Sequence, residues 1–376
     1  MMKCGGLVHR LRKISLLVTL LLPSVLLSVI AASAQKPLAE LPRVYIDTTW
    51  NEPSGGKTWR VHTSADLSNA LAKSAPGDVI VLDAGVTYAG NFKVPSKLNP
   101  NKRWIYVISS AYSSLPKPGI RVAPTDAANM PKIVSPNVGQ ALSFADGANR
   151  WRFVGIEVYS ASTYKPKGYP NFYAYALIDK TTYPSVSLPD SIVFDRVYVH
   201  GDSTHDVQRA ISANFSNTAL LDSYISDIHM AGTDTQAYGV WESPGPFKVV
   251  NNHLEAAGEN VMLGGAGGSN NAYIPSDIEV RGNYIYKPLS WVPLSRAPIN
   301  SMVVKNSFEL KSAQRVLFEN NTIENCWMAG QAGFAVVLTV RTSQSGDIAV
   351  VNDITITNNI LKNVTAGFNS LTVSRT

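Results

Sequence analysis

Two ionisable residues, Glu309 and Lys311, stand two positions apart in the segment VKNSFELKSAQRVLFENNTIENC (304–326). Side chains on a strand return to the same face every second residue, so a strand here would point both groups to one side. The pair then has two interpretations. It is either a solvated ion pair, or a site where burial and nearby cations lower the pKa of the lysine enough for it to act as a base near neutral pH.

Two other segments gather polar side chains. HGDSTHDVQR contains His200 and Arg209, and SDIHMAGTDTQ contains Asp227 and His229. Neither segment matches the ligand spacing of a known metal site. Each is therefore either a polar surface loop or part of a wall that binds a sugar or a metal ion, and the two loops together would form one side of a groove.

A glycine-rich segment, AAGENVMLGGAGGSNN (256–271), contains Glu259 near its start. Its glycines lack the strand-to-helix context of a phosphate-binding loop, so they indicate tight backbone geometry. Glu259 is a second candidate metal ligand. Aromatic residues crowd another segment, where they either pack a loop or stack on sugar rings: Tyr159, Tyr164, Tyr169, Phe172, Tyr173 and Tyr175.

The structural elements that must position these residues are encoded by a repeated sequence motif, called the repeated phrase below. RVLFENNTIEN at 315–325 recurs in variant form as FKVVNNHLEAAGEN, DIEVRGNYIY and DITITNNILKN. Equivalent positions are separated by 40, 27, 29, 31, 38 and 38 residues, and such long steps are typical of a solenoid, whereas the strands of a β-sandwich recur about every 8 to 12 residues. The positions taken as equivalent are Gly155, Asp195, Asp222, Asn251, Gly282, Asn320 and Asn358.

Each phrase predicts one turn of a coil. Val316 and Phe318 alternate as a strand with one buried face, and Ile323 resumes an inward position on the next strand. Asn320 and Asn321 interrupt the alternation, because Asn tolerates the left-handed backbone conformation of a tight bend. Stacked coils would place Asn above Asn, where amide groups can donate and accept along a ladder.

The segment TSADLSNALAKSAPGD (63–78) predicts a short amphipathic helix capped by Ser64 or Asp66 and stopped by Pro76-Gly77-Asp78, followed by a strand over 79–82. A helix in this place would cover the open end of a solenoid. The helix and the coils resemble the right-handed parallel β-helix proteins of the pectate-lyase-like superfamily, from about residue 58 to the end. This resemblance implies an all-β, single-stranded right-handed parallel β-helix that binds an extended polysaccharide.

The resemblance also narrows the chemistry. Polygalacturonases would require paired Asp residues and a Gly-His-Gly, and the commonest pectate lyases a Trp-Ile-Asp-His strand, and the chain contains none of these. Segment 304–326 is instead similar to chondroitinase B-like and alginate lyases. That similarity implies Glu309 as a Ca²⁺ ligand, Lys311 as the catalytic base and Arg341, one coil later, as its partner.

The first 34 residues have the layout of a secretory signal peptide: a basic start, an apolar stretch over 14–30 and the exit Ala32-Ser33-Ala34. Cleavage before Gln35 is expected, and an uncleaved membrane anchor is the alternative. Removing this segment takes away four of the 33 Lys and Arg and none of the 27 Asp and Glu, which leaves a net charge of +2. Such a balance does not favour nucleic-acid binding.

Removing the leader leaves Cys326 as the sole cysteine, so a large core must supply the stability. The expected organisation is a signal peptide (1–34), an N-terminal extension (35–57) and a β-helix domain (58–376). The chain stops inside an expected strand, LTVSRT, which predicts that a further element completes the domain and that this chain aggregates more readily than a longer one.

The sequence thus predicts a secreted, extracellular or periplasmic, monomeric protein that acts on uronate-containing glycans, with Ca²⁺ or without a metal. The preferred reaction is β-elimination. Lys311 and Arg341 are the expected catalytic residues and Glu309 and Glu259 the expected metal ligands, with substrate contacts from His200, Arg209, Asp227, His229 and Tyr173. A glycoside hydrolase on the same scaffold and a non-catalytic glycan-binding or adhesion protein are the alternatives.

Overall fold

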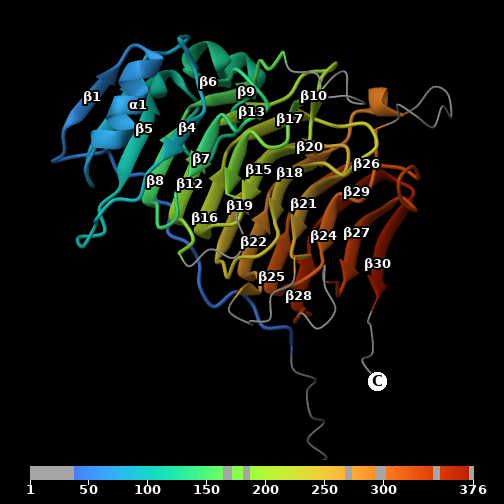
Figure 1. Cartoon of the computed structure of the whole chain (residues 1–376). Coiled ribbons are helices and arrows are strands. Elements are labelled where there is room, and N and C mark those ends of the chain that lie inside the picture. Colours follow the sequence, from blue (N-terminus) through green and yellow to red (C-terminus); the bar gives the residue numbers. More distant parts are fainter. Residues whose placement is uncertain are drawn as a thin grey trace, which may run out of the picture. The chain divides into compact units, whose positions relative to one another are not determined.

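The structure is a computed structural model, and it describes residues 38–163, 172–180, 187–266, 273–292, 302–341 and 348–371. The expected signal peptide, its cleavage point and the side chain of Tyr173 lie outside the described residues. The described strands form three long parallel sheets, which the chain visits in a fixed order, once per coil (Figure 1). The fold is a right-handed parallel β-helix, as the sequence predicts.

Sheet A has ten strands: β1 (Thr58–Val61), β2 (Val79–Leu82), β5 (Ile105–Ser109), β8 (Asn149–Val154), β12 (Asp190–Asp195), β16 (Ser216–Leu221), β19 (Phe247–Val250), β22 (Ser276–Arg281), β25 (Ala313–Glu319) and β28 (Val351–Thr357). Sheet B has nine: β3 (Thr87–Ala89), β6 (Lys132–Ser135), β9 (Glu157–Ser160), β13 (Tyr198–His200), β17 (Tyr224–Ile228), β20 (His253–Ala256), β23 (Tyr284–Tyr286), β26 (Thr322–Cys326) and β29 (Ile360–Val364).

Sheet C also has nine: β4 (Phe92–Val94), β7 (Leu142–Phe144), β11 (Ile178–Lys180), β15 (Arg209–Ala213), β18 (Gln236–Val240), β21 (Glu259–Leu263), β24 (Phe308–Leu310), β27 (Phe334–Thr339) and β30 (Ala366–Leu371). Outside these sheets, β10 (Phe172–Ala174) pairs with β14 (Asp206–Val207). Short 3₁₀ helices lie at Tyr112–Ser114, Pro124–Asn129 and Leu289–Trp291.

The bend between sheet A and sheet B depends on a left-handed residue in each coil. Six of the seven positions that the repeated phrase predicts have positive φ: Gly155 (63°), Asp222 (51°), Asn251 (58°), Gly282 (66°), Asn320 (55°) and Asn358 (55°). The prediction is wrong by one residue at Asp195, which ends β12, because the left-handed residue there is Arg196 (φ 51°). Gly, Asn and Asp tolerate this conformation best, which explains the composition of the phrase.

A ladder of buried asparagine side chains follows these bends. The Oδ1 atom of Asn283 accepts hydrogen bonds from the backbone N–H and the Nδ2 of Asn252, at 2.9 and 3.0 Å. Asn321 accepts the same pair of bonds from Asn283, and Asn359 from Asn321. The predicted ladder is therefore confirmed, and its rungs are the residues just after the left-handed ones. It satisfies polar groups that would otherwise be buried without partners.

The predicted helix is α1 (Ser64–Lys73), which packs against β1, β3 and β4 at one end of the coil stack (Figure 1). Its N-cap is Thr63, one residue before the predicted cap Ser64, and Thr63 and Asp66 form a capping box. Leu67, Ala70 and Leu71 are buried on its inner face. The interior of the coils is a single apolar cluster that extends from this helix to the last coils.

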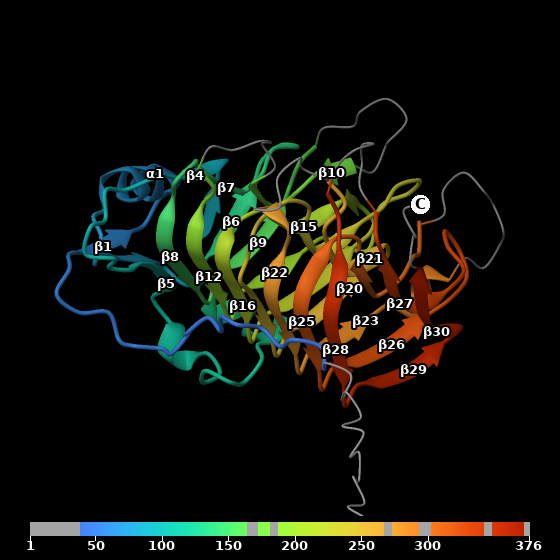
Figure 2. The ribbon, with the colours of Figure 1, turned by 90° about the horizontal axis from the view of Figure 1, so that it is seen from below.

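Residues 38–52 form a strap that crosses the outer face of sheet A (Figure 2). It runs against the direction in which the coils accumulate. Its contacts in order are Glu40 N–H to Asp353 Oδ1 (3.1 Å), Arg43 N–H to Asp277 Oδ1 (2.9 Å), Lys248 Nζ to the Ile46 carbonyl (3.0 Å) and Arg152 Nη1 to the Thr49 carbonyl (3.2 Å).

Among the described residues, no helix is both long and apolar enough to span a bilayer.

Candidate functional site

The outer face of sheet C carries the Glu309–Lys311 pair. Phe308 and Leu310 of β24 point into the core, so the alternation turns Glu309 outward between them. Glu309 pairs in register with Met262 of β21. Although it faces outward, its relative exposure is only 2%, so neighbouring side chains remove it from bulk water.

Glu259 reaches the same place from the preceding coil. It begins β21 directly after a tight bend at Gly258, whose N–H donates to Thr235 Oγ1 (2.7 Å). The Thr235 carbonyl oxygen lies 2.4 Å from the position of a Cβ on Gly258, so a larger residue would collide with backbone. The Glu259 N–H donates to that same carbonyl (2.8 Å). The bend therefore fixes the direction in which the carboxylate leaves the strand.

Glu259, Glu309, Lys305 and Lys311 form a compact group, the carboxylate–lysine cluster. Lys305 Nζ lies 2.5 Å from Glu259 Oε1, and Lys311 Nζ lies 3.8 Å from both Glu259 Oε1 and Glu309 Oε2. Gln236 donates to the other Glu259 oxygen at 2.8 Å. The structure thus brings together three of the four residues predicted for catalysis or metal binding, and it adds Lys305, which the sequence analysis missed.

The two carboxyl groups of the cluster are hydrogen-bonded to each other, which requires a proton between them. Burial acts to raise the pKa of Glu259, but the charges of Lys311 and Lys305 and the hydrogen bond from Lys305 outweigh it and lower this pKa. Burial and the neighbouring Glu259 raise the pKa of Glu309. The two pKa values are therefore shifted in opposite directions, which favours a proton on Glu309 over one on Glu259.

Two glycines make room for Lys311. Gly264 and Gly265 have φ of +84° and +109°, which disfavour any other residue. A Cβ on Gly265 would lie 2.8 Å from Lys311 Cδ, and one on Gly264 only 2.2 Å from the Ser312 nitrogen. The glycine-rich segment therefore forms a cradle for the lysine, which is 15% exposed and within reach of a ligand.

Arg341 lies one coil beyond Lys311, as predicted. Its backbone N–H donates to the Lys311 carbonyl at 2.8 Å, which puts the two residues in neighbouring positions on adjacent coils. The Arg341 side chain is exposed. Its predicted part in catalysis remains a prediction.

Beneath the cluster lies a second lysine that the sequence analysis did not find. Lys287 is fully buried, and its Nζ donates to the carbonyls of Ala256 (2.8 Å), Ala257 (3.0 Å) and Gly258 (2.5 Å) and to Asn260 Oδ1 (2.8 Å). These acceptors belong to the backbone bend that sets the direction of the Glu259 side chain. Burial lowers the pKa of Lys287 to about 8. Lys287 thus anchors the cluster from below.

Arg209 is the predicted substrate-binding residue that is linked to the cluster. Its Nε donates to Gln236 Oε1 at 3.0 Å, and Gln236 in turn donates to Glu259, so the three residues form a row over three coils. The Arg209 guanidinium carbon also lies 4.6 Å from the centroid of the Trp241 ring. The row runs from coil to coil along the outer face of sheet C.

The other predicted contacts lie elsewhere. His200 ends β13 of sheet B, where its Nε2 lies 3.0 Å from Glu157, and Asp227 lies in β17 of the same sheet. His229 is 2% exposed, so its ring is enclosed by protein. Burial and Glu255 raise the pKa of Asp227. The structure does not bring these side chains to the cluster, and their binding roles remain predictions, as does that of Tyr173.

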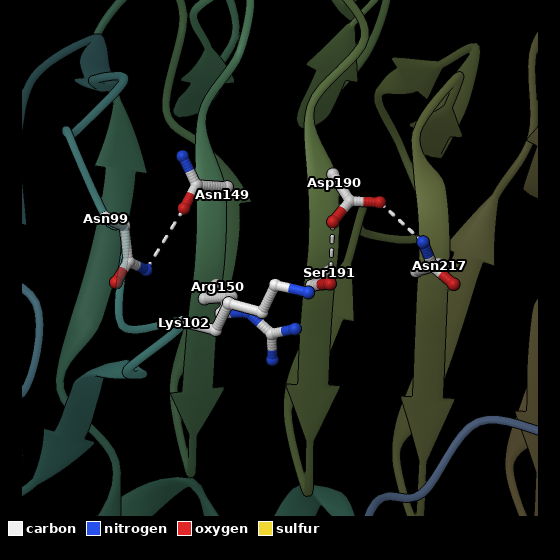
Figure 3. Close-up of a pocket in the computed structure, with 7 residues that line it drawn as sticks. All are labelled: Asn99, Lys102, Asn149, Arg150, Asp190, Ser191 and Asn217. Carbon is white, nitrogen blue, oxygen red and sulfur yellow. Dashed lines mark hydrogen bonds between the residues drawn. The ribbon is translucent and has the colours of Figure 1, made fainter.

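A polar hollow of about 470 Å³ lies on sheet A, at the start of β8, β12 and β16 (Figure 3). Its side chains bond to one another: Asn99 donates to Asn149 (3.1 Å), and Asn217 and Ser191 donate to Asp190 at 2.5 and 2.8 Å. It belongs to a different sheet from the cluster. Five of its seven lining residues are bonded to one another in this way, as expected for a structural network.

Glu259 and Glu309, the predicted calcium ligands, need further oxygen donors around them to hold the ion. Ca²⁺ takes six to eight oxygen ligands. Within the described ranges, no group of three or more His, Cys, Asp or Glu side chains is arranged to hold a metal ion. Glu259 and Glu309 do converge, but each already faces an ammonium group. The donor set therefore does not fit calcium, and calcium dependence remains a prediction without structural support.

No protein-family profile matches the chain, and no curated protein matches it in sequence. Solved structures that resemble it include an alginate lyase from Paenibacillus sp. str. FPU-7, with 16% identity over 83% of this chain and 97% of that one (TM-score 0.36). The pectate lyase Pel9A matches with 13% identity over 80% of each chain (TM-score 0.43). A mutant pectin methylesterase in complex with hexasaccharide IV matches with 10% identity over 78% and 82% (TM-score 0.41). The resemblance is one of fold.

Proposed function

We propose that this protein is a lyase that cleaves uronate-containing polysaccharides by β-elimination at the carboxylate–lysine cluster. The observation that carries the proposal is the buried Glu259–Glu309 pair, which faces two lysine ammonium groups on the outer face of sheet C. Elimination needs three things: a positive charge at the substrate carboxylate, a base for the C5 proton and support for the leaving oxygen. The cluster offers groups for the first two, and Arg341 lies on the next coil.

In the proposed reaction, the Lys311 ammonium first loses a proton to solvent, and the neutral amine then takes the proton from C5 of the uronate. The electron pair of the C–H bond forms a C4=C5 double bond, and the C4–O bond breaks. The leaving oxygen departs with the electron pair of the C4–O bond and takes up a proton from solvent. Arg341 would assist from the next coil, since stacked strands lie about 4.8 Å apart and neighbouring side chains can meet around one sugar. No step depends on a metal.

Arg209 and Gln236 extend the site toward earlier coils. A polysaccharide lying along the coil stack would pass this row after leaving the cluster, and the Arg209 charge suits a second uronate carboxylate. We propose Arg209 as a substrate contact and Gln236, which is buried and bonded to Arg209 and Glu259, as the residue that positions it. His200, Asp227, His229 and Tyr173 belong to the proposal only if the bound chain extends beyond sheet C.

The glycoside hydrolase alternative is disfavoured by the geometry of the carboxyl pair. Hydrolases hold their two carboxyl groups about 5 to 10 Å apart around the scissile bond. Glu259 and Glu309 are in direct hydrogen-bond contact instead. The proposal further includes secretion, after cleavage of the expected signal peptide, a monomeric state, and no binding of nucleic acid or membrane.

The test is the ultraviolet absorbance of the new double bond, measured on alginate, polygalacturonate and chondroitin polymers. Lys311→Met should lower kcat by about 10²- to 10⁴-fold, as the loss of a general base does, and leave the fold intact. Lys93→Met, at an exposed lysine of β4 in the same sheet, is the matched control and should keep full activity. Absence of elimination by the wild type on every uronate polymer would replace the lyase proposal with the binding-protein alternative.

A further inference from the structure

Lys305 occupies an unusual position in the cluster. Its Nζ lies 2.5 Å from Glu259 Oε1 and 2.9 Å from Asp234 Oδ2, and its side chain is 9% exposed. It stands in the bend just before β24, so it enters the site from the edge of sheet C rather than from a strand. Asp234 is 44% exposed, which sets the ammonium at the boundary between the buried carboxylates and solvent.

The charge of Lys305 is firmly held. Burial acts to lower the pKa of this lysine, but the charge of Glu259 and hydrogen bonds to Asp234 and Glu259 raise it well above its ordinary value. A lysine ammonium has three N–H donors, and among the described residues Glu259 and Asp234 accept two of them. The geometry leaves a donor for an oxygen that approaches from solvent.

A divalent cation at the same carboxylate would conflict with this arrangement. An ion bound to Glu259 Oε1 would lie within a few ångströms of the Lys305 ammonium, where like charges in a poorly hydrated site repel strongly. Lys311 and the buried Lys287 add positive charge on two further sides. Three ammonium groups already act on the ionised carboxylate.

We propose that Lys305 takes the place of a metal ion: its ammonium, held by Glu259 and Asp234, is the cation that neutralises the carboxylate of a bound uronate, and the site works without calcium. The exclusion of calcium rests on the contacts of Lys305 and on the two further ammonium groups near Glu259. The role toward a substrate carboxylate rests on the proposed function. These two parts are tested by separate measurements.

The first measurement is a calcium titration by calorimetry, together with thermal unfolding in calcium or in a chelator. Wild type should show no binding heat and the same Tm in both. Lys305→Met should gain calcium binding, because it frees the oxygens of Glu259 and Asp234 that the ammonium holds, with Asn306 Oδ1 as a third donor that is buried and without a hydrogen-bond partner in the described residues. Lys305→Arg keeps the positive charge and should bind no calcium.

Calcium binding by wild type that Glu259→Gln abolishes would overturn the inference. So would a folded Lys305→Met that gains no affinity, because the lysine would then not be what excludes the ion. If Lys305→Met does not fold, Lys305→Gln takes its place in the titration. None of these outcomes depends on turnover, so failure of the lyase proposal leaves this test intact.

The second measurement is equilibrium binding of an oligouronate to Lys311→Met, which is expected to bind without turning over. Adding Lys305→Met to that variant should weaken binding by about 10- to 100-fold, as the loss of a hydrogen bond from a charged group does. Adding Lys93→Met should change nothing. Equal affinity of the two double variants would refute the role of Lys305 toward the carboxylate.

Discussion

Replacement of Lys287 by methionine is the sharpest probe of what lies beneath the cluster. The change removes a fully buried ammonium that donates to three consecutive carbonyls and to Asn260. At pH 7 we expect Lys287→Met to lower the free energy of unfolding by about 1–3 kcal/mol, the cost of leaving a buried hydrogen-bond acceptor without its donor. The larger effect of the substitution is on how stability depends on pH.

Burial lowers the pKa of Lys287 from 10.5 to about 8, with smaller effects from Cys326, Glu259 and Lys305. The unfolded chain keeps this proton up to about pH 10.4. Between these two values the unfolded state binds more protons than the folded state, so the free energy of unfolding rises with pH. At 1.36 kcal/mol per pKa unit, the rise totals about 3 kcal/mol. For a chain of this length that corresponds to about 4 °C in Tm.

The assay is thermal and urea unfolding of wild type and Lys287→Met at several pH values from 7 to 10.5. Groups that titrate equally in both proteins cancel in the difference. Wild type should gain about 3 kcal/mol over the variant between pH 8 and pH 10.5. Lys93→Met should follow wild type throughout. A difference that stays constant over this interval would show that Lys287 titrates alike in the folded and unfolded chain, and the account of a buried charge would be wrong.

Two further predictions concern the scaffold. Asn283→Leu should lower the free energy of unfolding by about 2–4 kcal/mol, because the donors of Asn252 and the carbonyl of Val249 lose their buried partner; an unchanged urea midpoint would contradict this. Burial acts to lower the pKa of His229, but the Asp206 carboxylate, 3.7 Å from the ring Nδ1, and a hydrogen bond from Nε2 to the Asp202 carbonyl raise it, so its contribution to stability is present below about pH 6.5 and is lost as pH rises through the folded value. His229→Gln should therefore destabilise the protein more at pH 5.5 than at pH 8.5, and equal losses of Tm at both would argue against a charged His229.

The sequence predicted the coils because their bends have a chemical signature. Asn320, Asn358 and Asp222 are residue types that accept the left-handed backbone, and each occurs at the expected place. Arg196 shows where this signal fails. Arginine has no preference for that conformation, so the neighbouring Asp195 was the more plausible residue by type, and only the structure moves the bend by one position.

The site was predictable where its residues share a strand. Glu309 and Lys311 follow from the two-residue repeat, and Glu259 from its place before a glycine-rich bend. Lys305 lies in the same segment, 304–326, and its place just before the strand that carries Glu309 was a usable sign that it could reach the site. Lys287 had none: it reaches the bend of the preceding coil only because coils of unequal length stack in register, and the spacing of 27 residues to Asn260 is not marked in the sequence.

The strap over sheet A changes how the coils depend on one another. In a solenoid whose coils touch only their neighbours, losing the last coil leaves the first one intact. Here residues 38–52 are tied to Asp353 and to Arg152, so an early coil and a late coil share one segment. The strap is synthesised before every coil it crosses, and its partners lie 202 to 313 residues later for three of its contacts. It can dock fully only after β28 has formed, so its docking reports that the stack has been built through to that strand.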